Sequence, residues 1–142
     1  MTKQVSASRV GVKFSPRLSC NDIEDKDAEE FYPYILEKLN GKNLAYVHVG
    51  DHAGEGWHAR LRPHYRGVYF AGANFTKESG AELLAQNGAD AIAYGVKFLA
   101  NPDLPERFKR DASLNKPDKS TFYSPGEHGY TDYPLLEQAS AA

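Results

Sequence analysis

Cysteine, excess charge and long apolar runs are all scarce in this sequence, and each shortage excludes a class of protein. The one cysteine, Cys20, cannot form an internal disulfide. The 17 lysines and arginines stand against 19 aspartates and glutamates, and the resulting net charge of -2 provides no basic surface for a nucleic acid. No apolar stretch approaches the roughly 20 residues of a membrane helix, and no N-terminal segment has the pattern of a signal peptide. We therefore expect a cytoplasmic protein with no nucleic-acid or membrane partner.

The 142 residues contain an alternation of two kinds of segment, over a length that is typical of one domain. Short apolar segments, each followed by glycine, proline or polar residues, predict strands at 9–16, 44–49, 67–72 and 89–94. Segments with helical spacing predict helices near 27–39, 57–65, 76–87 and 106–110. The tail from residue 112 is expected to be irregular.

Two of the predicted helices carry further signals. The apolar residues of the first fall on one helical face: Phe31, Tyr34, Ile35 and Leu39. Pro33 lies inside this helix and predicts either a kink or a later start. In the helix at 76–87, Thr76 is expected as the N-cap and Gly88 as the stop. Its inward-facing residues are expected to be Leu83 and Leu84.

Strands that alternate with helices predict parallel βαβ units with right-handed crossovers, hence an α/β fold. The strands are almost continuously apolar, as in sheets that helices cover. Glycine and polar residues follow their C-terminal ends, where proteins of (β/α) architecture bind ligands. A closed TIM barrel takes eight such units and roughly 250 residues. We therefore expect residues 1–142 to form a single half-barrel, with two open sheet edges.

Six segments, in a fixed order, carry a resemblance to a known family. They are VGVKFSP at 10–16, YVHV at 46–49, FAGANFT at 70–76, AIAYGVKFLANPDLPERF at 91–108, LNKPDKSTFY at 114–123 and HGYTDYP at 128–134. Together they resemble the C-terminal half of the Old Yellow Enzyme family of FMN-dependent ene-reductases. The resemblance implies an eight-stranded TIM barrel, of which the four strands here are the fifth to the eighth. It also implies FMN at the C-terminal mouth, reduced by NADPH or NADH and reoxidised by the activated alkene of an unsaturated carbonyl compound.

The resemblance places part of a flavin site on two of these strands. Lys13 stands where the family usually has an arginine that contacts the flavin ring, although a lysine lacks the two-point contact of a guanidinium. The alternative is an ordinary strand residue. Gly72, Ala73 and Asn74 match a segment whose backbone N–H groups hold the flavin phosphate in relatives. The alternative there is a strand-to-helix turn that Thr76 caps.

A second part of the implied phosphate site follows the last predicted strand. Gly95 would allow backbone N–H groups to approach phosphate oxygens closely. Val96 stands where most relatives have an arginine that pairs with the phosphate, and Lys97 comes next. Two alternatives follow: either Lys97 reaches the phosphate, or backbone donors hold it alone and more weakly.

The resemblance supplies a substrate contact but no catalytic residue. Tyr123 matches a tyrosine that lines the substrate pocket above the flavin, with Phe122 beside it, and simple packing is the alternative for both. The residue pair that binds the substrate carbonyl in the family belongs to an earlier segment of the barrel. We therefore expect an FMN-dependent NAD(P)H oxidoreductase whose present chain is inactive alone. Its partner would be a second copy or a chain that supplies the missing half-barrel.

Two other functions stay open at this stage. One is a non-catalytic half-barrel that self-associates and binds at most a phosphate ligand. The other is a hydrolase that uses the loop residues Asp51, His52 and Glu55, on composition alone. No metal site is expected, because the histidines at 52, 58 and 64 are six residues apart and match no ligand spacing. His48 is expected to be a hydrogen-bonded core histidine.

Overall fold

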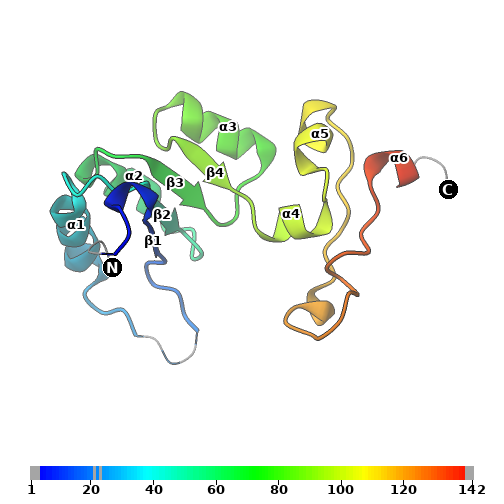
Figure 1. Cartoon of the computed structure of the whole chain (residues 1–142), viewed down its shortest axis with the longest axis horizontal. Helices are drawn as coiled ribbons and strands as arrows, with labels where there is room; N and C mark the ends of the chain where they lie inside the picture. Colours follow the sequence, from blue (N-terminus) through cyan, green and yellow to red (C-terminus); the bar gives the residue numbers. More distant parts are fainter. Residues whose placement is uncertain (1–3, 21, 23, 140–142) are drawn as a thin grey trace. The chain divides into compact units, whose positions relative to one another are not determined.

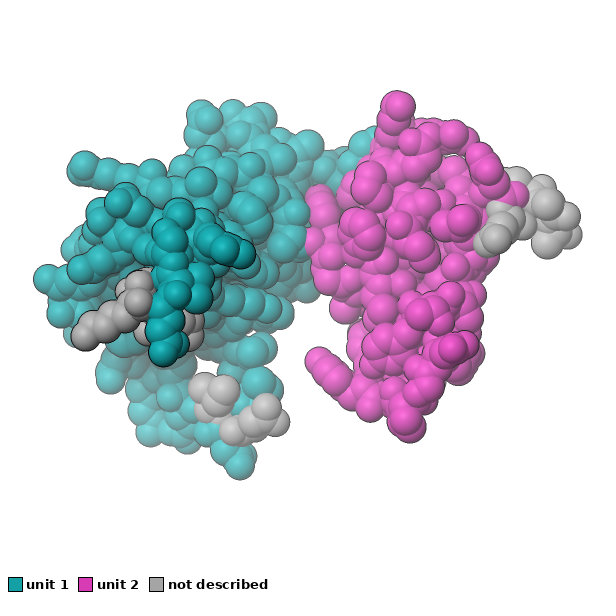
Figure 2. Space-filling view, in the orientation of Figure 1, with its two compact units in different colours: residues 1–93 teal, residues 94–142 magenta. Residues whose placement is uncertain are grey.

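A computed structural model describes residues 4–20, 22 and 24–139 of the chain. Its contacts divide the chain into two compact units, Met1–Ala93 and Tyr94–Ala142 (Figure 2). The ends of the range predicted to form one half-barrel, 1–3 and 140–142, lie outside the described residues. That domain assignment stays a prediction, and each unit is described by itself.

The first unit is built on a four-stranded parallel sheet (Figure 1). Its strands are β1 (Gly11–Phe14), β2 (Tyr46–Gly50), β3 (Tyr69–Gly72) and β4 (Ala91–Ala93), and they pair in the order in which they occur in the chain. The four predicted strands and their parallel direction are thus confirmed, although each strand is shorter than the segment predicted for it. β1 and β4 each pair with one neighbour only and form the edges of the sheet.

Three helices connect these strands: α1 (Ala28–Leu39), α2 (Trp57–Leu61) and α3 (Lys77–Ala85). α1 passes through Pro33 and therefore does not begin after it. Thr76 caps α3 as predicted: its hydroxyl accepts the Ser79 N–H at 3.1 Å, and the Ser79 hydroxyl accepts the Thr76 N–H at 2.9 Å. This reciprocal capping box satisfies two N–H groups that the helix itself cannot pair.

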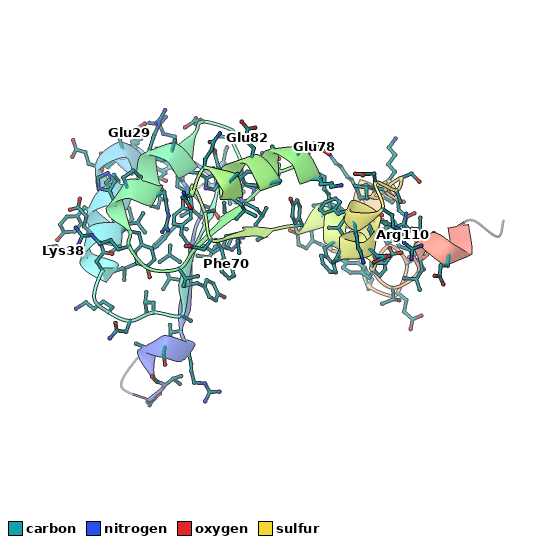
Figure 3. All side chains as sticks on the ribbon, turned by 90° about the horizontal axis from the view of Figure 1, so that it is seen from above. Glu29, Lys38, Phe70, Glu78, Glu82 and Arg110 are labelled. Carbon is teal, nitrogen blue, oxygen red and sulfur yellow. The ribbon has the colours of Figure 1, made fainter. Side chains whose placement is uncertain are left out.

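The hydrophobic core of this unit lies between the helices and one face of the sheet. On that face Phe14, Val49, Ala71 and Ile92 are aligned across the four strands. Helix residues pack against them, including the fully buried Leu36, Trp57 and Leu61. Because side chains alternate along a strand, the neighbouring strand residues lie on the opposite face. Phe70 lies on that opposite face, across the sheet from the α3 residues Glu78 and Glu82 (Figure 3).

We call this second surface the open face. It comprises the strand positions Gly11, Lys13, Tyr46, His48, Gly50, Phe70, Gly72, Ala91 and Ala93. In a closed barrel of parallel strands, the face away from the helices is the interior. The open face is therefore the surface that the rest of a barrel would enclose.

Two predictions about helix faces are only partly confirmed: Leu39 of the predicted α1 face and Leu83 of the predicted α3 face pack against the core, but other members of each face are exposed. In α1, Phe31 and Tyr34 are 48% and 58% exposed, because the packed stripe runs instead through Ala28, Tyr32 and Leu36. The Tyr32 ring meets the rings of Phe14 and Trp57 edge-on, with centroids 5.9 and 6.0 Å away. In α3, Leu83 packs against the core as predicted, but Leu84 is 39% exposed.

The second unit contains α4 (Val96–Ala100), α5 (Leu104–Lys109) and α6 (Leu136–Ala139), with a 3₁₀ turn at Lys119–Thr121. α4 was not predicted. α5 begins two residues before the predicted start, with Pro105 in its first turn, where the missing N–H costs no helical hydrogen bond. The rest of the tail is irregular, as predicted.

A buried arginine connects α5 to this irregular tail. The Arg107 side chain is 1% exposed and donates to Asp103 Oδ1 at 2.7 Å, to the Ser113 carbonyl at 2.6 Å and to the Pro134 carbonyl at 2.9 Å. The second carboxylate oxygen of Asp103 accepts the Leu136 N–H at 2.7 Å. A single ion pair therefore fixes three points of a tail that has little regular structure of its own.

Candidate functional site

Lys13 lies on the open face of the sheet, on strand β1. Its Cα pairs with that of His48 on β2, which in turn pairs with Phe70 on β3. Lys13 is exposed, while Val47 and Val49, the neighbours of His48 along β2, are fully buried on the helix side. The sheet therefore presents a cation and an imidazole side by side on the surface away from the core.

Glycines on the open face make room for rings from the next strand. A Cβ at Gly72 would collide with Nε2 of His48, and one at Gly11 would overlap the ring of Tyr46. The ring of Tyr46 also stacks on that of Phe70, with centroids 4.6 Å apart and planes 5° from parallel. The rings of Tyr46 and His48 therefore occupy space on the open face that a side chain at Gly11 or Gly72 would need.

His48 is not the hydrogen-bonded core histidine that the sequence led us to expect. It is half-buried on the open face, and its Nε2 atom is buried with no hydrogen-bond partner among the described residues. Burial lowers the pKa of His48 below its ordinary value, and the charge of Lys13 lowers it further, as do His58 and His52. The ring is therefore neutral near pH 7.

The loop after β3 has an unusual backbone. Ala73 and Asn74 both have left-handed conformations, with φ of 73° and 61°, which cost energy in residues other than glycine. The Asn74 side-chain amide donates to the carbonyls of Asp51 and His52, at 3.3 and 3.1 Å. Asn74 thus joins the loops after β2 and β3, and the predicted phosphate contact of Gly72, Ala73 and Asn74 stays a prediction.

The loop after β2 is organised around Asp51. Its buried carboxylate accepts the N–H groups of Glu55, Gly56 and Trp57, at 3.0, 2.9 and 3.0 Å. These bonds fix the loop and the start of α2. The described hydrogen bonds of Asp51 include none to His52, so the geometry does not favour the hydrolase alternative.

The remaining predicted site residues belong to the second unit. Gly95 precedes α4 as its N-cap residue, and Val96 and Lys97 form the first turn of that helix. The Lys97 carbonyl accepts the side-chain amide of the buried Asn101 at 2.9 Å. The segment is therefore a helical turn with a fixed backbone rather than an extended loop.

Tyr123 is presented to solvent by a strained backbone. Its φ is 62° and its side chain is 99% exposed, while Phe122 is half-buried. The Tyr123 N–H donates to the Tyr130 hydroxyl at 2.7 Å, and the Ser124 N–H donates to the Thr121 carbonyl at 3.1 Å. Packing of the side chain therefore does not explain this conformation, and the substrate contact of Tyr123 and Phe122 stays a prediction.

Comparison with known proteins decides the family. No family model matches the sequence. The chain is 41% identical over 136 residues to a probable flavin mononucleotide-dependent alkene reductase of Leishmania infantum, covering 93% of this chain and 37% of that protein. The old yellow enzyme from Trypanosoma cruzi superposes with a TM-score of 0.88 at 31% identity, over 95% of this chain and 37% of that one. The chain belongs to the Old Yellow Enzyme family.

A second solved member of the Old Yellow Enzyme family, morphinone reductase in complex with tetrahydroNAD, superposes with a TM-score of 0.85 at 38% identity. The match covers 97% of this chain and 39% of morphinone reductase. The four parallel strands are thus part of a TIM barrel of this family, and the predicted fold class is confirmed. The chain spans about two fifths of the length of the relatives it matches, and its assignment to strands five to eight stays a prediction.

Two absences can be stated for the part of the chain that the structure describes. No group of three or more histidine, cysteine, aspartate or glutamate side chains gathers there as a metal site would require. No helix in the same residues is long and apolar enough to cross a membrane.

Proposed function

We propose that the chain is part of an FMN-dependent oxidoreductase that reduces activated alkenes of unsaturated carbonyl compounds with NADPH or NADH. One observation carries the proposal: Lys13 lies beside the glycine-lined part of the open face, on the surface that becomes the interior of a closed barrel. Two printed names support it, because one relative is a probable FMN-dependent alkene reductase and a structural neighbour was solved with tetrahydroNAD.

The residues of this chain fit a flavin in chemical type. The Lys13 ammonium would stabilise negative charge on the ring. In the first unit, Gly72, Ala73 and Asn74 would offer backbone donors to the phosphate, as the resemblance to the family implies. The resemblance gives the same role to Gly95 and Val96 of the second unit, with Lys97 as the next residue. Tyr123 and Phe122 would contact the substrate. Bound FMN would supply the hydride for the alkene.

We assign no catalytic residue to this chain under the same proposal. Polarising the substrate carbonyl needs preorganised donors at the oxygen, and no residue of this chain matches the family's pair for that role. We therefore expect the isolated chain to bind flavin without turning over an alkene. A chain that supplies the rest of the barrel would provide the missing donors.

Flavin retention tests this function directly. The purified chain, dialysed against FMN, is expected to retain the yellow flavin and to release it on denaturation. Lys13→Met should weaken retention, whereas Lys38→Met, on an exposed position of α1, should not. A chain that stays colourless at saturating FMN contradicts the proposal and favours the non-catalytic, self-associating half-barrel.

The open edges of the sheet predict association with a partner. Among the described residues, each edge strand, β1 or β4, has no strand neighbour along one side, and such edges template pairing with other chains. We expect the chain to self-associate or to bind a complementary half-barrel. Light scattering should give a mass above that of the 15.8 kDa chain. A concentration-independent monomer mass contradicts this prediction.

A further inference from the structure

His48 has a ring whose two nitrogen atoms lie in different surroundings. Nε2 lies against Gly72, buried and without a hydrogen-bond partner among the described residues, whereas Nδ1 is not enclosed in this way. An N–H group at Nε2 would be buried without an acceptor, which is costly. The neutral ring therefore carries its proton on Nδ1, where it remains available as a donor.

The surroundings of His48 also oppose a second proton. The charged and titratable groups that act on it are Lys13 on β1, His52 in the loop after β2 and His58 on α2, and each of them opposes a further positive charge. No carboxylate is among these groups. The imidazole is therefore held as a neutral donor rather than as a cation.

Lys13 and His48 are paired in register on the same face, so the two donors lie in one region of the sheet. The stacked rings of Tyr46 and Phe70 lie on that face as well and make part of it aromatic. Two donors beside aromatic rings suit a heteroaromatic ligand whose edge carries carbonyl or imine acceptors.

We propose that His48, as the neutral Nδ1–H tautomer, is a second cofactor-binding donor beside Lys13, directed at the acceptor atoms of the flavin ring. This inference rests on the proposed function, because the flavin is the planar ligand that the function requires. It adds a residue that sequence patterns assigned to the core. It also gives Gly72 a structural role, since any side chain there would displace the imidazole.

The tautomer is measurable without flavin. Nitrogen-15 NMR of the histidine-labelled chain should show the neutral His48 ring protonated at Nδ1 and unprotonated at Nε2. Its pKa should lie below that of an ordinary histidine, because burial and the charge of Lys13 lower it. A proton on Nε2, or an ordinary titration, overturns the inference. This measurement uses the unaltered chain and so does not depend on whether variants fold.

Ligand titrations then test the donor. Riboflavin lacks the phosphate, so a residue that binds the ring should affect riboflavin and FMN by the same factor. We expect His48→Leu to weaken both by roughly 3- to 10-fold, the range of one hydrogen bond. His48→Asn should keep most of the affinity, because its amide N–H can replace Nδ1–H. His64→Leu, on a turn that faces Glu37, should change neither ligand.

The outcomes separate the two proposals. If the unaltered chain binds neither flavin, the proposed function fails and the flavin is lost as the ligand of His48. If it binds both and His48→Leu binds them equally well, the function stands and the inference fails. A loss confined to FMN would also overturn it, because His48 would then act through the phosphate.

Discussion

Replacing Arg107 with methionine should lower the free energy of unfolding of the second unit by about 3 kcal/mol or more, the cost of removing one partner of a buried ion pair. The methionine keeps the apolar volume of the stem but removes every donor. Asp103 Oδ1 and the carbonyls of Ser113 and Pro134 then lose the bonds that Arg107 makes to them. Hydrogen exchange of the α5 amides is the appropriate measurement, because it reports on this unit alone.

Arg110 provides a matched control on the same helix. Arg110, which Figure 3 labels, pairs with Glu106 at i,i+4, as Arg107 pairs with Asp103. Its side chain, however, is 54% exposed. Exposed pairs contribute about 0–1 kcal/mol, so Arg110→Met should change exchange little. Equal effects of the two substitutions would show that burial of Arg107 does not determine its contribution.

The consequence for function follows from what Arg107 holds. The two tail carbonyls that it binds, those of Ser113 and Pro134, flank the segment that presents Phe122 and Tyr123. Asn115 adds two more bonds, to the carbonyls of Ala100 and Pro134, at 2.8 Å each. Replacing Arg107 should therefore make the segment that carries Phe122 and Tyr123 more mobile, although Arg107 itself is not a proposed substrate contact.

The sheet was predictable because its signal is local and repeated. Each strand is a short apolar segment between helical segments, and parallel order follows from that alternation. The short helix α4 was missed because five residues are too few to show a helical period, and its apolar composition continues that of β4. The packed face of α1 was not predicted, because this helix has two apolar stripes. The sequence alone does not show which of them packs against the sheet.

For the candidate site too, some features could be predicted from local sequence and others could not. The role of Lys13 was predicted from its motif; the structure places it exposed on β1, and its flavin contact stays a prediction. His48 was assigned to the core because β2 is apolar, although its alternation with Val47 and Val49 places it on the opposite face. The burial of its Nε2 atom without a hydrogen-bond partner could not be predicted, because it depends on the strand register that brings His48 against Gly72. Such a contact between strands leaves no trace in local sequence.

Replacing Trp57 with alanine should cost the first unit about 3–5 kcal/mol, the usual range for removing a large buried aromatic side chain. Trp57 is fully buried, and the guanidinium groups of Arg17 and Arg60 lie 5.6 and 5.2 Å from its ring centroid. Its indole N–H also donates to Glu55 at 3.2 Å. Domains of this size are stable by roughly 5–15 kcal/mol, so the variant should be close to unfolding.

Circular dichroism in urea should measure this loss, because the substitution removes the only tryptophan. Tyr123→Ala is the control: a large aromatic side chain that is 99% exposed should contribute no more than about 0.5 kcal/mol. The Trp57 N–H is one of the three that Asp51 accepts, and Asn74 joins that same loop to the end of β3. Flavin retention should therefore fall together with stability in the Trp57 variant. If stability fell while retention did not, the loops after β2 and β3 would not contribute to flavin binding, and Lys13 and His48 would remain as its contacts in this unit.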